Sequence, residues 1–182
     1  MKLQIPLVQL ILLVFQIATT FAHAQASISS AASSATTQIE AGQSSRTATH
    51  KQGMNFVTTR VAITATAPYS VDLNTVFLKA DSQQYPVLAI SMTCGSSETD
   101  EPVFTPLRYA EVRGVTVEVG SIYKLSAGLE LSTVKDGPAT LSVAHPPATV
   151  CLLFAAPSGL RLTSSVLVGI IADPIKVPAA AK

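Results

Sequence analysis

Short apolar runs with a two-residue period constrain the fold of this chain most. Between positions 54 and 65, Val57, Val61 and Ile63 share one parity, whereas Thr58 and Arg60 take the other. This alternation is typical of a half-buried β-strand, because successive side chains of a strand point to opposite faces. No stretch shows the apolar stripe of an amphipathic helix. The pattern favours an all-β protein.

Further strand candidates follow at short, regular spacing. They occupy 75–80, 85–94, 114–120, 122–131, 132–143, 149–157 and 160–170, and most of the 11 prolines and 9 glycines fall between the runs. In the last run the parity groups Leu162, Val166 and Val168 on one face, and an Asp136-Gly137 turn divides the run at 132–143. We therefore expect an antiparallel, immunoglobulin-like β-sandwich of roughly seven to nine strands.

The first 24 residues have the layout of a cleavable secretory signal. Lys2 precedes an apolar core from Leu7 to Phe15, and the small residues Ala22 and Ala24 follow it. We expect cleavage after Ala24. The apolar core is shorter than the roughly 20 residues of a membrane-spanning helix, although retention as an anchor is the alternative. The sequence thus predicts a secreted or periplasmic protein that is not inserted in a membrane after cleavage.

Export determines how the two cysteines are interpreted. Cys94 and Cys151 are the only cysteines, and a thiol pair in an oxidising compartment usually forms a disulfide. The parity of 85–94 places Cys94 with Leu88 and Ile90, so we expect an inward-facing bridge that joins one sheet to the other. The chain-entropy model gives such a bridge about 4 kcal/mol of stabilisation. Two unpaired, buried cysteines are the alternative.

Composition divides the exported chain into zones. Residues 25–53 are rich in Ser, Ala, Thr and Gln, with Ile28 and Ile39 as their larger apolar groups. So little apolar area predicts a flexible leader. The sandwich domain is expected at 54–174 and a C-terminal tail at 175–182.

Two segments carry a resemblance to a known family. They are "NTVFLKADSQQYPVLAI" at 74–90, a strand with a polar turn and an aromatic residue, and "TVCLLFAAPSG" at 149–159, a late apolar strand that ends in Pro. With them, residues 54 to 174 resemble small exported bacterial immunoglobulin-like domains of the mycobacterial immunoprotective extracellular antigen type. The hallmarks of true immunoglobulin domains are absent, since the chain has no Trp and Thr149 stands where a tyrosine corner requires Tyr. The resemblance implies a fold and a compartment, and no catalytic residue.

Few residues are candidates for chemistry. His145 precedes two prolines, and a Ser-His-Asp site built from His145 and Asp136 has no supporting motif. The acidic group Glu98, Asp100 and Glu101 lacks the ligand spacing of a calcium loop. We predict no catalytic residue, no metal site and no cofactor. The candidate surface-binding residues are Tyr109 with its neighbours Arg108 and Arg113, and His145.

Charge excludes some partners. The net charge is +1 with 13% charged residues, which is not the basic profile of a nucleic-acid-binding protein. We expect a non-enzymatic binding or structural module of the cell envelope, whose partner is a protein or envelope component. A small secreted hydrolase and a carbohydrate-binding module are the alternatives. For the latter, the chain offers only dispersed tyrosines, of which Tyr69 and Tyr85 are examples.

Overall fold

A computed structural model gives the fold and describes residues 24–41, 44–49, 53–91, 94, 101–107, 122–124, 129–133 and 138–179. These residues form an all-β, sandwich-like protein, as predicted. Besides strands, they contain two short 3-10 turns, η2 (Leu73–Thr75) and η4 (Leu162–Ser164).

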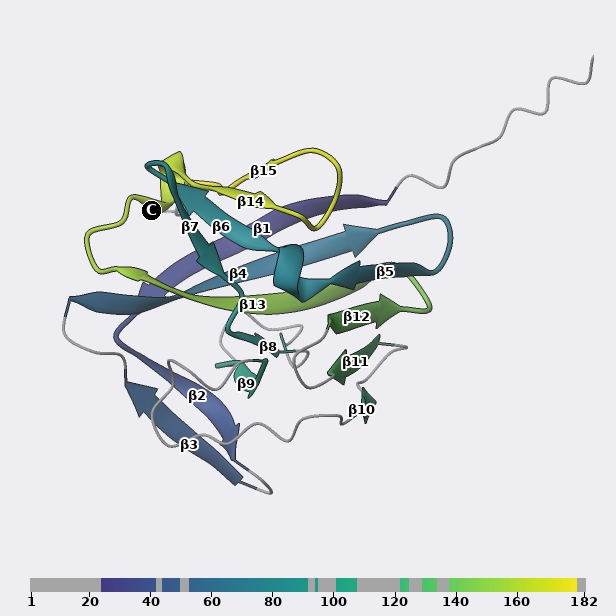
Figure 1. The fold of residues 1–182 in the computed structure, drawn as a ribbon, viewed down its shortest axis with the longest axis horizontal. Helices are drawn as coiled ribbons and strands as arrows, with labels where there is room; N and C mark the ends of the chain where they lie inside the picture. The colour runs from purple at the N-terminus through teal and green to yellow at the C-terminus, as the bar shows by residue number, and fades with distance from the viewer. Residues whose placement is uncertain are drawn as a thin grey trace, which may run out of the picture.

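The largest sheet runs through the middle of the molecule (Figure 1). Within the described residues it has seven strands, in the spatial order β1 (Gln25–Ser34), β4 (Met54–Thr64), β13 (Ala148–Pro157), β8 (Ala89–Ser91), β9 (Val103–Pro106), β2 (Thr36–Ala41) and β3 (Ser44–Thr49). Neighbouring strands are antiparallel, except that β2 and β9 are parallel.

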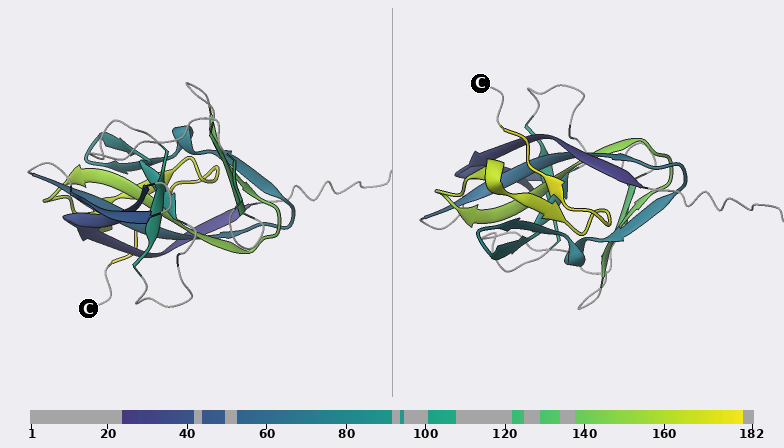
Figure 2. Two further views of the ribbon diagram at one scale, coloured as in Figure 1. Left: turned by 90° about the horizontal axis from the view of Figure 1, so that it is seen from below. Right: turned by 90° about the horizontal axis from the view of Figure 1, so that it is seen from above.

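Two smaller sheets accompany it. One has the order β10 (Ile122–Lys124), β11 (Leu129–Thr133), β12 (Ala139–Val143) and β5 (Tyr69–Asp72). The other has the order β15 (Ile175–Lys176), β14 (Val166–Val168), β6 (Phe77–Ala80) and β7 (Gln83–Pro86). Figure 2 shows β14 and β15 lying over the long strands of the central sheet. The described strands outnumber the seven to nine that we predicted, because β1, β2, β3, β5, β9 and β15 lie outside the predicted runs and the run at 85–94 is divided.

The strands β4 and β13 form the centre of the fold. On β4 the predicted parity is confirmed, since Val57, Thr59, Val61 and Ile63 are buried. On β13 both faces are buried: Leu152 belongs to the larger hydrophobic core, and Leu153 belongs to a second, smaller core. A strand with two buried faces needs apolar residues at every position, and this explains why 149–157 is a continuous apolar run.

The larger core fills the space between the central sheet and the two smaller ones. Val71 and Leu141 enter it from β5 and β12, and Leu78 and Leu167 enter it from β6 and β14. Paired sheets that bury apolar faces against each other define a sandwich.

The smaller core results from a curl of the central sheet. The first and sixth strands of that sheet, β1 and β2, are separated in sequence by Ala35 alone. One residue spans too short a distance to cross a flat sheet of this width, so the sheet must curl and bring β2 back toward the start of β4. The curl encloses Ile39, Phe56 and Phe104, all at most 1% exposed.

The expectation of a flexible leader at 25–53 is wrong. This zone forms β1, β2 and β3, all within the central sheet. Its few apolar side chains are well placed, since Ile28 enters the larger core and Ile39 the smaller one. Backbone hydrogen bonds to β4 and β9 also hold these strands in place. The backbone N–H and C=O groups of Ser and Thr can form such bonds without a large apolar area.

The predicted boundary at 174 is also wrong, because the C-terminal residues 175–177 are part of the fold. Ile175 pairs with Leu167, Val177 is buried, and the Val177 backbone N–H donates to the Ser165 carbonyl oxygen at 3.1 Å. The strand predicted at 160–170 is interrupted as well. The turn η4 occupies 162–164, and β14 begins only at Val166, so Leu167 is buried while Val166 and Val168 are half-buried.

Candidate binding surface

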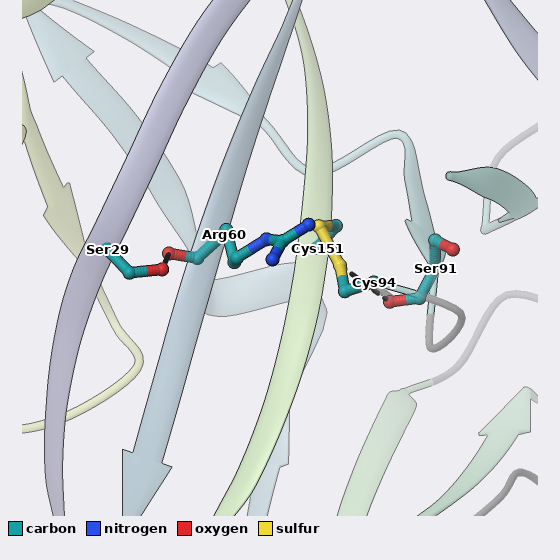
Figure 3. Close-up of a disulfide and its surroundings, with 5 residues drawn as sticks. All are labelled: Ser29, Arg60, Ser91, Cys94 and Cys151. Atoms are coloured by element: carbon teal, nitrogen blue, oxygen red, sulfur yellow. Dashed lines mark hydrogen bonds between the residues drawn. A yellow bond between two sulfur atoms is a disulfide. The ribbon is translucent and has the colours of Figure 1, made fainter. Parts of the chain in front are cut away.

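The two cysteines lie at disulfide distance and are joined in the structure. Their Cα atoms are 5.8 Å apart, and both residues line the smaller core. Cys151 pairs across the ladder with Ser91 at the end of β8, and Cys94 lies just beyond that strand. Figure 3 shows Cys94 turning back toward Ser91, and its Sγ lies 3.7 Å from the Ser91 carbonyl oxygen.

This geometry corrects the expected inter-sheet staple. The bridge joins β13 to the segment that follows β8, and β8 is the neighbour of β13 in the same sheet. It therefore fixes the start of the connection to β9, the strand that holds β2. On the other side of Cys151, Figure 3 shows the Arg60 side chain of β4 extending toward the bridge, and Arg60 and Cys151 are ladder partners.

His145 lies in the connection between β12 and β13 and is exposed. That connection, 144–147, runs beside the connection between β4 and β5, 65–68. The residues at both ends of the two connections are ladder partners: Ile63 pairs with Ala148 in the central sheet, and Tyr69 pairs with Val143 in the smaller one. The two connections must therefore lie side by side. Both connections lie at the end of the molecule where β4 passes into β5 (Figure 1).

The resulting surface, which we call the crossover end, comprises residues 64–69 and 144–149 together with Gln25. Gln25 joins it because β1 begins there, and the Thr64 hydroxyl donates to the Gln25 carbonyl oxygen at 3.3 Å. Exposed positions on this surface are Gln25, Thr64, Thr66, Pro68, Ala144, His145, Pro147 and Thr149. None of these side chains carries a fixed charge, so the side chains of the crossover end offer amide, hydroxyl, prolyl and imidazole groups.

Tyr69 belongs to this end and was not among the residues predicted for binding. It is partly buried and packs against the larger core, and this burial raises the pKa of its phenol. A tyrosine with its ring in the core and one side accessible is a common anchor in recognition surfaces. The Pro68-Tyr69 step after a strand was the available signal in the sequence, but only the ladder to Val143 places it next to the His145 connection.

The structure tests the remaining predicted residues only in part. Arg108, Tyr109 and Arg113 lie outside the described residues, as do Asp136, Glu98 and Asp100. Glu101 is described and exposed. Within the described ranges, no three side chains of His, Cys, Asp or Glu gather into a group that could hold a metal ion. Neither of the helical turns in those ranges has the length and hydropathy needed to cross a membrane.

Comparison with known proteins gives no relative. No protein-family model, no curated protein and no solved structure matches the chain.

Proposed function

We propose that this chain is an exported, non-enzymatic binding or structural module of the cell envelope, which contacts a protein partner through the crossover end. The observation that carries the proposal is the composition of that end. Two short connections and the beginning of β1 meet there, and they present hydroxyl and prolyl groups around His145 and the half-buried Tyr69. Loops held by a rigid sheet are the usual place for binding residues.

The proposed compartment is supported by the cysteine pair and by the beginning of the first strand. A buried pair at disulfide distance is typical of proteins from oxidising compartments. The strand β1 starts at Gln25, the first residue after the predicted cleavage site. Cleavage after Ala24 would therefore leave every described strand in the mature chain.

The partner proposal is tested by affinity capture from an envelope extract. The chain 25–182 is immobilised beside a variant that carries Thr66→Arg and Pro147→Arg, two exposed positions of the crossover end. The control variant carries Ser158→Arg, exposed beyond the opposite end of β13. We expect the same captured protein on the unmodified chain and the control, and its loss on the crossover variant. Equal capture by all three chains contradicts the assignment of this surface.

A further inference from the structure

We propose that the N-terminal strand β1 is exchanged between copies of this chain, so that β1 of one copy pairs with β4 of another. The partner is a second copy of this chain, and the surface that it contacts is the edge of β4. The proposal rests on the proposed export in one respect, because β1 has a free end only after removal of the residues before Gln25.

The attachment of β1 depends mainly on its backbone. Nine of its residues pair with β4 over the range Gln25–Ser34, and the strand is the outermost one of its sheet. Ile28 is its one buried side chain, and Ala26 and Ala31 are partly buried against the core. Exposed side-chain bonds add to this: Asn55 Nδ2 donates to Ser33 Oγ at 3.1 Å, Ser29 Oγ donates to the Arg60 carbonyl oxygen at 3.3 Å, and the Thr64 hydroxyl donates to the Gln25 carbonyl oxygen at 3.3 Å.

The edge that β1 covers is apolar and needs a strand. Ile28 lies opposite Val61, and Val57 and Ile63 of β4 are also buried in the larger core. Without β1, these side chains would border an open strand edge, which is a template for pairing with another chain. The strand that fits this edge in register is β1, and an identical β1 from a second copy makes the same contacts.

The hinge for this exchange is Ala35. It is exposed, forms a bend, and is the single residue between β1 and β2. A hinge this short must change the course of the chain between the first and the sixth strand of one curled sheet. When β1 leaves, residues 25–41 can straighten into one extended segment, and short hinges of this kind favour strand exchange. Because the contacts within the two forms are the same, hinge geometry and protein concentration decide between them.

The register of the ladder provides a direct test. Ala32 and Thr58 are Cα partners between β1 and β4, whereas Thr64 pairs with Gln25 at the far end of the same ladder. Chain 25–182 with Ala32→Cys is incubated at high concentration with chain 25–182 carrying Thr58→Cys, and is then oxidised. We expect a covalent heterodimer joined between positions 32 and 58, identified by peptide mass spectrometry. The yield should exceed that of the Ala32→Cys and Thr64→Cys mixture roughly tenfold, because register holds the first pair at a millimolar effective concentration.

Two further variants make every outcome decisive. A single chain with both Ala32→Cys and Thr58→Cys must form the bond internally when dilute, and failure to do so would overturn the register on which the exchange depends. Insertion of Gly-Gly-Ser-Gly after Ala35 should reduce the 32–58 heterodimer to the level of the Thr64→Cys control. Equal yields from the two original mixtures would refute the exchange. Because these chains begin at Gln25, that result would leave export untouched, and the N-terminus of the exported protein tests export separately.

Discussion

Gly169 follows β14 and has a backbone φ of +90°, a conformation that L side chains rarely adopt. A Cβ atom at this position would overlap the backbone carbonyl of Thr75 in η2. Gly53 has a similar φ of +83°, but its Cβ would meet nothing within 4 Å. The two glycines therefore separate the cost of backbone strain from the cost of steric overlap.

We predict that Gly169→Ala lowers the free energy of unfolding by about 1–3 kcal/mol more than Gly53→Ala does. Gly53→Ala should cost only about 1–2 kcal/mol, for the left-handed backbone. Urea denaturation of both variants measures the difference. Equal losses would show that the backbone of Thr75 does not approach Gly169 closely.

Thr59 is a polar residue in a fully buried position. It is 0% exposed in the middle of β4, and its hydroxyl is the buried side-chain oxygen that lacks a hydrogen-bond partner within the described residues. Burial of an unpaired hydroxyl costs about 1–3 kcal/mol.

Thr59→Val should therefore raise the free energy of unfolding by about 1 kcal/mol or more, because valine keeps the shape and removes the hydroxyl. The matched control is Thr58→Val on the opposite face of β4, where the side chain is half-buried and a change within about 0.5 kcal/mol is expected. A destabilised Thr59→Val variant would mean that the hydroxyl has a partner.

At the scale of single elements, β5 links the larger core to the crossover end through Tyr69. Burial raises the pKa of this phenol from its usual value of 10.0. The folded protein therefore holds the phenolic proton more tightly than the unfolded chain does. The resulting stability is complete below pH 10 and is lost as the pH rises through the folded pKa.

The test compares the unmodified chain with Tyr69→Phe. Lysines also titrate near pH 10, but their contribution is the same in both chains and cancels in the difference. We expect a constant difference in unfolding free energy between pH 7 and about pH 9. Above pH 10 the unmodified chain should lose stability relative to the variant. A difference that stays constant through that range would contradict a buried phenol.

Elements differ in how well the sequence predicts them, and the reasons are physical. The strands β4 and β13 were predictable because the polarity of their side chains follows their burial, which alternates along β4 and is continuous along β13. The strands β1 to β3 were not, because backbone pairing and two isoleucines stabilise them and Ser/Thr composition resembles that of a flexible segment. At 160–170, alternation suggested one strand, but η4 shifts the parity so that Leu167 faces the core.

Of the predicted surface residues, His145 is the one within the described part of the chain, and it lies on the candidate surface. Its place in a connection between strands agrees with the two prolines after it, whereas the approach of Tyr69 and Gln25 to the same end depends on ladders between distant segments. The position of the bridge also depends on such a ladder. Cys94 and Cys151 were identified as a pair from composition and compartment, but only the pairing of Cys151 with Ser91 shows that they belong to neighbouring segments of one sheet.

For the whole molecule, two cores share the central strands β4 and β13, and the curl of the sheet between β1 and β2 separates them. The larger core is covered by two further sheets. The smaller one is enclosed by the curl and contains the cysteine pair. We infer that the protein is exported, that its mature chain starts with β1, and that Cys94 and Cys151 form a disulfide.

Intact-mass spectrometry of the protein recovered from the exporting cells, with and without reduction before alkylation, tests this claim most directly. We expect the mass of residues 25–182 less two hydrogens, no alkylation before reduction, and alkylation of both cysteines after it. A mass that retains the first 24 residues, or alkylation of both thiols without reduction, would contradict it.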